Sequence, residues 1–193
     1  MEIIKKLWNK SWEKYFQLYK VFGISEKLLL SIIFSILTGI SAQLYIKLPF
    51  TPVPITGQTF SVLLSGILLG KNFGSLSQIF YFIGGISGIG WFYGGGTGIL
   101  RPTTGYIIGF IFASYIAGYF SERKNKVLGM VLATITIYIC GIIFLKFFID
   151  KEFKDLVFIG ILPFIPFDII KAVLAGLIAE NLSNLKIIQK ENR

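Results

Sequence analysis

Residues 156–179 read LVFIGILPFIPFDIIKAVLAGLIA, an apolar run of membrane-spanning length that contains one acid and one base, Asp168 and Lys171. An ionisable side chain at bilayer depth costs several kilocalories per mole unless it is paired, faces a cavity or serves a function. The i,i+3 spacing places both charges on one helix face, and Pro163 and Pro166 predict that this helix begins near Pro166. The pair is either a structural ion pair or the polar part of a pocket for a zwitterionic or carboxylate-bearing solute, and we favour the pocket.

The composition indicates a membrane protein, because 54% of the 193 residues are apolar and only 15% are charged. Uncharged runs of 18 or more residues mark spanning helices. They cover residues 28–46, 48–70, 72–100, 102–121 and 127–145, and the opening segment makes a sixth. The sequence therefore predicts an all-α integral membrane bundle of six transmembrane helices at residues 27–182, with an N-terminal segment at 1–26 and a tail at 183–193.

The basic residues indicate orientation rather than nucleic-acid binding, although the net charge is +9. With six spans, one side holds Lys5, Lys6, Lys10, Lys14, Lys20, Lys27, Lys71, Arg123, Lys124, Lys126, Lys186, Lys190 and Arg193. The other side holds Lys47, Arg101, Lys146, Lys151 and Lys154. Since positive charge accumulates on the cytoplasmic side, both termini are predicted to be cytoplasmic.

The first 26 residues contain aromatic side chains at helical spacing among lysines: Trp8, Trp12, Tyr15, Phe16 and Tyr19. This pattern predicts an amphipathic helix on the inner membrane surface rather than a signal peptide, which would need an apolar core and a small-residue cleavage site. The single cysteine, Cys140, excludes an intramolecular disulfide.

Two stretches cannot be regular helices. Residues 47–58, KLPFTPVPITGQ, carry three prolines and are expected to form an outer loop that leads into a shorter helix near Thr56. Residues 84–98, GGISGIGWFYGGGTG, are too rich in glycine to stay helical against lipid. Both loops fall on the side where the Asp168 helix begins, so Trp91, Phe92 and Tyr93 could cover a solute held by the charged pair. Tight helix packing is the alternative role for the glycines, and we favour a binding loop.

Three motifs together carry a family resemblance: PVPITGQT at 52–59, RPTTGYIIGF at 101–110 and PFDIIK at 166–171. In this order and at this spacing they resemble the BioY family, the biotin-specific substrate-binding (S) component of energy-coupling factor (ECF) transporters of bacteria and archaea. The resemblance covers residues 28–181. It implies a six-helix bundle in the cytoplasmic membrane of a prokaryote, with a site near the outer surface. It also implies import that requires a T component and two ATPase subunits, so that ATP is used by the partners and the chain itself needs no cofactor.

The resemblance also implies a set of substrate-binding residues. Asp168 would accept hydrogen bonds from the ureido N–H groups of biotin, and Lys171 would meet the valerate carboxylate or donate within the same network. Gln58 and Thr56 lie where the family's first loop closes over the ligand. The further predicted site residues are Tyr81, Gln78, Trp91, Tyr93 and Arg101.

Arg101 and Thr104 stand where the family usually has glycine, which leaves the local loop conformation open. Arg101 is also a candidate partner for the carboxylate. In the first span, Ser31, Ser35 and Gly39 recur at four-residue intervals, a spacing that lets another helix approach closely. In the family an alanine-rich version of this pattern docks the T component. Internal packing is the alternative.

No enzyme site is expected, because the chain has no histidine, the usual general base and metal ligand. Gly70-Lys71 lacks the rest of a phosphate-binding P-loop. Three hypotheses remain: an S component for biotin or a close analogue, a structural or assembly subunit organised by the charged pair, and a self-sufficient secondary carrier of another small carboxylate vitamin.

Overall fold

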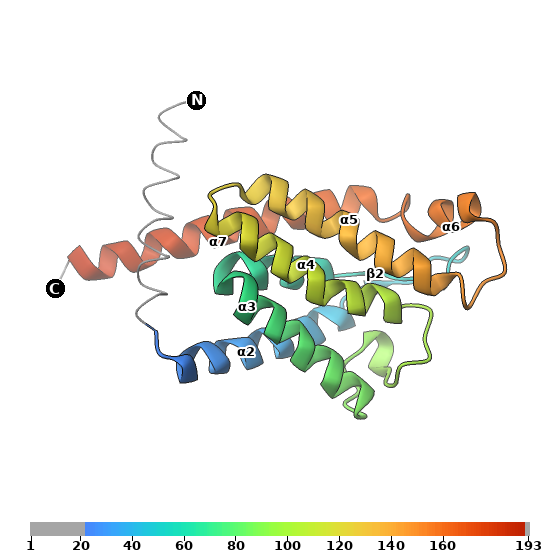
Figure 1. Ribbon diagram of the computed structural model, residues 1–193, viewed down its shortest axis with the longest axis horizontal. Helices are drawn as coiled ribbons and strands as arrows, with labels where there is room; N and C mark the ends of the chain where they lie inside the picture. The colour runs from blue at the N-terminus through green and yellow to red at the C-terminus, as the bar shows by residue number, and fades with distance from the viewer. Residues whose placement is uncertain (1–21, 192–193) are drawn as a thin grey trace.

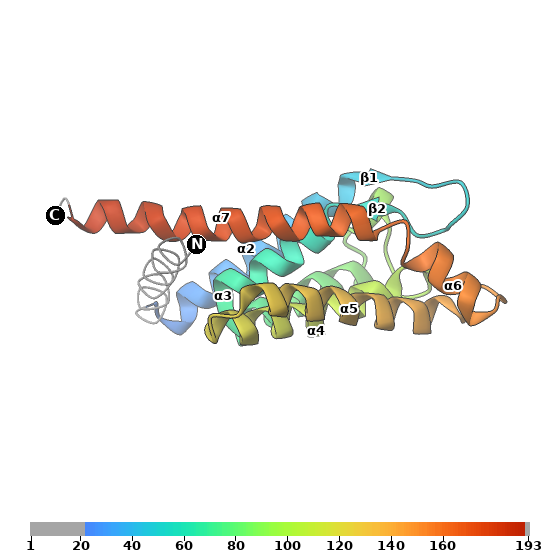
Figure 2. The ribbon, with the colours of Figure 1, turned by 90° about the horizontal axis from the view of Figure 1, so that it is seen from above.

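The computed structural model describes residues 22–191, with side chains up to residue 179. Its elements are α2 (Ile24–Gln43), β1 (Tyr45–Ile46), β2 (Ile55–Thr56), α3 (Gln58–Ile86), η1 (Tyr93–Gly95), α4 (Thr104–Glu122), α5 (Lys126–Leu145), α6 (Phe153–Gly160) and α7 (Ile165–Glu191). Figures 1 and 2 show α4, α5 and α7 running along the longest axis of an elongated bundle. The predicted helical bundle is confirmed, whereas most of the predicted amphipathic segment, up to residue 21, lies outside the described residues.

Helix α3 folds back on itself at Gly70. This residue has φ 72° and ψ 177°, a conformation that glycine alone adopts readily. Two hydrogen bonds join the halves on either side: Gln58 Nε2 donates to the Tyr81 hydroxyl at 2.7 Å, and Gln78 Nε2 donates to Ser65 Oγ at 3.0 Å. The two halves therefore lie antiparallel, and α3 supplies two passes through the bundle.

The chain makes six passes when this reversal is counted. Helices α2, α3, α4 and α5 are long and apolar enough to cross a membrane, and α6 with α7 forms one further span, bent by 48°. The sixth pass differs from the continuous run predicted for residues 156–179. It breaks between Gly160 and Ile165, because Pro163 lies in the break and Pro166 is compatible with the first turn of α7. The predicted helix start near Pro166 is confirmed.

Small hydroxyl side chains join the helices inside the bundle. Ser41 Oγ lies 2.6 Å from Ser61 Oγ, and Ser65 Oγ lies 3.0 Å from Ser114 Oγ. All four side chains are buried, so these bonds satisfy polar atoms that would be costly in an apolar core. Large aliphatic side chains are exposed instead, as expected of helices surrounded by lipid; on α2 they are Ile24, Leu28, Leu29, Ile32, Ile33, Ile36 and Ile40.

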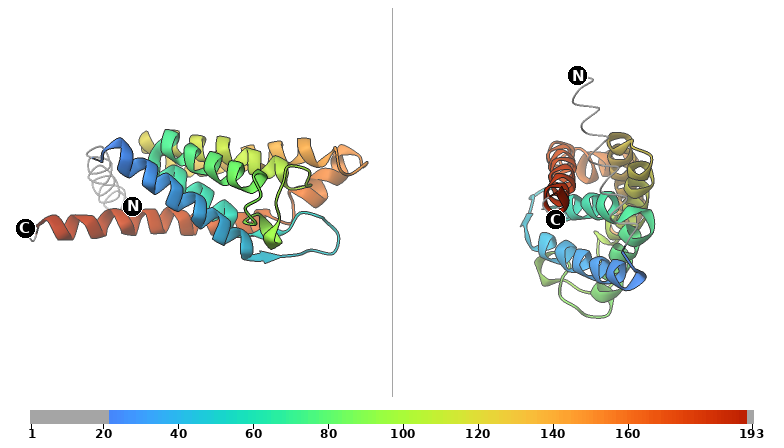
Figure 3. Two further views of the ribbon diagram at one scale, coloured as in Figure 1. Left: turned by 90° about the horizontal axis from the view of Figure 1, so that it is seen from below. Right: turned by 90° about the vertical axis from the view of Figure 1, so that its left-hand side faces the viewer.

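The irregular segments gather at one end of the bundle. β1 pairs antiparallel with β2, with Tyr45 opposite Thr56, so the first loop is a hairpin that the sequence did not predict. Figure 3 shows this hairpin, the glycine-rich loop and α6 at one end, with α2 crossing the bundle obliquely. The Lys71–Glu122 ion pair, 3.8 Å long, marks the opposite end. This end also carries Arg123 and therefore matches the predicted basic side.

Replacing Gly70 with alanine should destabilise the bundle by about 1–3 kcal/mol, because the residue would hold a conformation unfavourable for any side chain. An added Cβ would also lie 2.8 Å from Glu122 Oε1. Thermal unfolding of the purified protein in detergent measures the effect. Gly176→Ala is the control, since a Cβ there meets nothing closer than Met130 Cε at 3.6 Å. Equal melting temperatures for Gly70→Ala and wild type would contradict the reversal at this residue.

Candidate functional site

A cavity of about 50 Å³ lies at the loop-bearing end of the bundle. Residues of the hairpin, the glycine-rich loop and helices α3, α4, α5 and α7 line it. Its lining residues are Val53, Pro54, Ile55, Thr56, Gln58, Thr59, Tyr93, Thr103, Tyr106, Ile107, Phe110, Ile137, Tyr138, Phe164, Asp168 and Lys171. The predicted site residues Thr56, Gln58, Tyr93, Asp168 and Lys171 are therefore brought together around one space.

Asp168 is the buried charge of this cavity, with 5% of its surface exposed. The Tyr138 hydroxyl donates to its Oδ2 at 2.6 Å, and Lys171 Nζ donates to its Oδ1 at 2.7 Å. Asp168 also lies in the first turn of α7, where the partial positive charge of the helix N-terminus stabilises a carboxylate. Since a carboxylate offers about four acceptor positions, the group is compensated within the protein and can still accept hydrogen bonds from a ligand.

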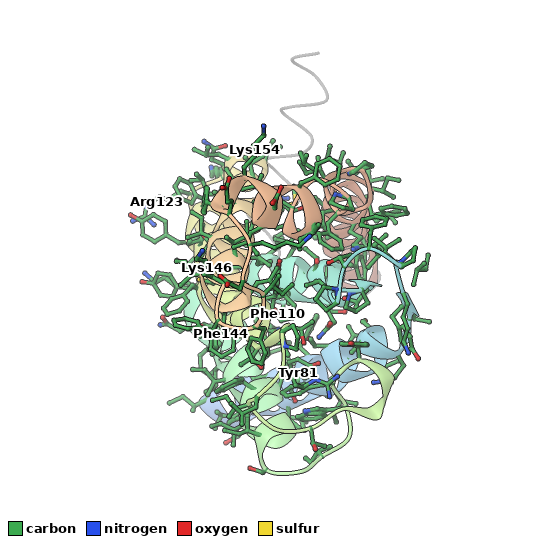
Figure 4. The ribbon with its side chains drawn as sticks, turned by 90° about the vertical axis from the view of Figure 1, so that its right-hand side faces the viewer. Tyr81, Phe110, Arg123, Phe144, Lys146 and Lys154 are labelled. Atoms are coloured by element: carbon green, nitrogen blue, oxygen red, sulfur yellow. The ribbon has the colours of Figure 1, made fainter. Side chains whose placement is uncertain are left out.

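Two tyrosines that sequence reasoning missed complete the wall. Tyr138 comes from α5 and holds Asp168, while the Tyr106 hydroxyl donates to the Gly160 carbonyl at 2.9 Å and so fixes the end of α6. Tyr106 lies inside the RPTTGYIIGF motif, which was a usable signal. Tyr138 is a polar group in an apolar helix, but its direction depends on how α5 packs. Figure 4 shows Phe110, another wall residue, near the middle of the bundle together with Tyr81.

A chain of hydrogen bonds connects the first loop to the second. Thr56 Oγ1 donates to Gln58 Oε1 at 2.9 Å, and Gln58 Nε2 donates to the Tyr81 hydroxyl. The Tyr81 hydroxyl in turn donates to the Trp91 carbonyl at 3.3 Å, while Trp91 Nε1 donates to the Tyr81 carbonyl at 2.9 Å. Tyr81 and Trp91, predicted as site residues, do not line the cavity. They stand behind Gln58 and support it.

Gln78 differs more clearly from its prediction as a wall residue. It is fully buried between helices, and its Nε2 lies within hydrogen-bonding distance of three hydroxyl oxygens, Thr38 Oγ1, Ser65 Oγ and Ser77 Oγ. The i,i+3 spacing from Tyr81 correctly places both on one face of the helix, but this face meets α2 and the first half of α3. Gln78 is therefore part of the polar packing of the bundle and not of the cavity.

Arg101 braces the glycine-rich loop at the rim of the cavity. Its guanidinium carbon lies 5.0 Å from the centre of the Tyr93 ring, and Nη2 donates to the Tyr93 carbonyl at 3.3 Å. Arg101 does not line the cavity, but Tyr93 does. Two buried polar atoms here have no partner among the described residues: Arg101 Nε and the hydroxyl of Thr103, a lining residue. Of the two, only the Thr103 hydroxyl belongs to a residue that lines the cavity, where a polar ligand group could use it.

The small-residue face of α2 points into the bundle. Ser31 and Ser35 are buried, and the Ser31 hydroxyl donates to the Phe73 carbonyl at 2.9 Å. A Cβ on Gly39 would lie 3.0 Å from Cβ of Trp91. This geometry favours the alternative of internal packing for Ser31, Ser35 and Gly39, because small residues permit close approach to any neighbouring helix or loop. Docking of a T component at these residues stays a prediction.

Comparison with known proteins shows the family of this chain. The BioY family model matches residues 11–187. The biotin transporter BioY of Thermotoga maritima is 34% identical over 150 residues, covering 74% of this chain and 88% of the relative. The probable biotin transporter BioY of Pyrococcus horikoshii is 40% identical over 153 residues, covering 78% and 91%. A crystal structure of the S-component for biotin from an ECF-type ABC transporter matches with a TM-score of 0.76 at 26% identity, covering 83% of this chain and 92% of that one.

Replacing Gly39 with leucine should lower the melting temperature of the isolated protein, because the new side chain collides with Trp91. Replacing the neighbouring Ile40 with leucine is the control, since Ile40 is 60% exposed and faces outward. Thermal unfolding in detergent compares them. A Gly39→Leu variant as stable as the control would show that this face is not packed internally.

Proposed function

This chain belongs to the BioY family, and we propose that it captures biotin as the S component of an ECF-type transporter. The observation that carries the proposal is the Asp168–Lys171–Tyr138 network in the wall of a cavity that also has apolar walls. Membership of this family places the chain among transporter components rather than enzymes.

Biotin has the chemistry that this wall can recognise. Its bicyclic ring system is apolar on its faces and suits Ile107, Phe110 and Ile137. Its ureido N–H groups need a buried acceptor, and the Asp168 carboxylate provides one. Lys171 holds that carboxylate and so belongs to the same polar network.

The valerate carboxylate needs a cationic or hydroxyl partner. Arg101, at the rim behind Tyr93, and the unpartnered hydroxyl of Thr103 supply these donors. We assign them to this end of the ligand, so that Asp168 and Arg101 bind different ends of biotin.

The cavity must widen to accept such a ligand. Sites for small molecules measure roughly 300–1,000 Å³, whereas this cavity measures about 50 Å³. The hairpin and the glycine-rich loop form its cover and are the segments not fixed within long helices. Capture therefore includes movement of these loops and closure over the ligand.

Transport itself requires partners in this proposal. The chain carries no phosphate-binding P-loop, so ATP would be used by two ATPase subunits joined through a T component. The chain needs no cofactor of its own. The protein is a multi-pass membrane protein, and we place it in the cytoplasmic membrane of a prokaryote with the loop-bearing end outside.

Replacing Asp168 with asparagine should weaken biotin binding by about 2 kcal/mol or more, because it removes the acceptor charge and leaves the Lys171 ammonium buried without its partner. Isothermal titration calorimetry with the detergent-solubilised protein measures the affinity. The control is Asp155→Asn, an exposed acid in α6. If Asp168 only organised the bundle, the variant would lose stability while the folded fraction bound biotin as wild type does, and the site assignment would fail.

Uptake of labelled biotin should depend on co-expression with a T component and its ATPases. Cells that lack their own biotin transporter and produce the chain alone should bind biotin at the membrane without accumulating it. A Walker-motif lysine substitution in the ATPases should abolish accumulation but not binding. Accumulation by the chain alone would favour the self-sufficient carrier instead.

A further inference from the structure

A second hollow lies between α5 and α7, on the lipid-facing side of the bundle. It has a volume of about 610 Å³. Its lining residues are Val127, Met130, Val131, Thr134, Ile135, Tyr138, Ile139, Ile161, Ile165, Asp168, Ile169, Ala172 and Val173. Many of the aliphatic residues here are exposed, including Val131, Ile139 and Ile169. This apolar groove therefore opens toward the hydrocarbon of the bilayer.

Only two residues belong to both the ligand cavity and this groove: Tyr138 and Asp168. They are joined by the 2.6 Å hydrogen bond from the Tyr138 hydroxyl to Asp168 Oδ2. Farther along the two helices, a Cβ on Gly176 would lie 3.6 Å from Met130 Cε. The Tyr138 ring, fixed at its hydroxyl end, therefore stands as a partition between a small cavity with both polar and apolar walls and a large apolar groove.

We propose that Tyr138 determines specificity by closing the site against this groove and so excluding ligands with an apolar extension at the end bound by Asp168. The inference rests on the proposed function, because it takes the ureido group to be at Asp168. Without the ring, the two spaces would merge. An alkyl group on a ureido nitrogen could then enter the groove, and each buried methylene would contribute about fourfold in affinity.

The hydrogen bond and the ring have separable effects. Tyr138→Phe keeps the ring and removes only the hydrogen bond to Asp168. It should therefore lower the affinity for every ligand without changing the order of their affinities. Tyr138→Ala removes the partition itself. Phe110→Ala enlarges the cavity from another wall, and since Phe110 does not line the groove, this variant opens no path to it.

The test compares biotin with a biotin that carries a butyl group on one ureido nitrogen and keeps the other N–H. Their affinities are measured by calorimetry for wild type and the three variants in detergent. Wild type and Tyr138→Phe should strongly prefer biotin. In Tyr138→Ala the ratio of the affinity for biotin to that for the butyl derivative should fall by about tenfold or more. This is less than the full contribution of four buried carbons, at about fourfold each. Phe110→Ala should not reproduce that change.

An unchanged preference in Tyr138→Ala, or an equal change in Phe110→Ala, would overturn the partition. If Tyr138→Ala does not remain monodisperse, the same affinities are measured for Tyr138→Val, and the same outcomes are expected. The butyl ester of biotin, which carries the alkyl group at the valerate end, should not gain affinity relative to biotin in Tyr138→Ala or Tyr138→Val. A gain in affinity confined to this ester would also overturn the inference. Failure of wild type to bind biotin at all would be a different result, since it removes the proposed function together with this inference.

Discussion

The need to compensate one carboxylate inside an apolar bundle determines how the ligand end of this protein is built. Asp168 is almost fully buried, and its two oxygens are held by side chains from two helices, Lys171 from α7 and Tyr138 from α5. Removing Lys171 would leave the carboxylate without a counter-charge in a medium of low polarity, and removing Tyr138 would leave one of its oxygens without a donor. The Tyr138 contact ties α5 to α7 beside the cavity, whereas the Lys171 contact lies within α7. The group that is costly to bury therefore also joins two helices and offers acceptor positions to a ligand.

The rest of the bundle makes this arrangement possible by bringing helices close together. The reversal at Gly70 turns α3 into two antiparallel helices that present Gln58 and Tyr81 to each other. Pairs of serines then hydrogen bond across helix contacts at 2.6 and 3.0 Å. The glycine-rich loop is held over the cavity by two contacts within the protein. Trp91 packs against Gly39 of α2, and the Arg101 guanidinium packs against the Tyr93 ring.

The sequence predicted the features that depend on local chemistry. Uncharged runs gave the number of passes, prolines and glycines gave the two loops, and the charge spacing gave the Asp168–Lys171 pair. Features that depend on which element packs against a given helix face were harder to predict. Tyr138 was missed because α5 is apolar on several sides and nothing local tells which side meets α7. Ser31, Ser35 and Gly39 form a pattern that fits a partner's helix or the protein's own core equally well, and only the fold shows that the core receives it.

The shortness of the first half of α3 has a consequence for the path that a solute travels. Residues 58–69 form a helix about 18 Å long, well below the hydrocarbon thickness of about 30 Å. The Gln58 end, where the cavity lies, is level with Tyr81 and stops short of the Ile86 end of α3, and the hairpin and the glycine-rich loop cover it. A molecule can therefore reach this position only past the two loops, so the same segments that cover the bound ligand also limit its entry.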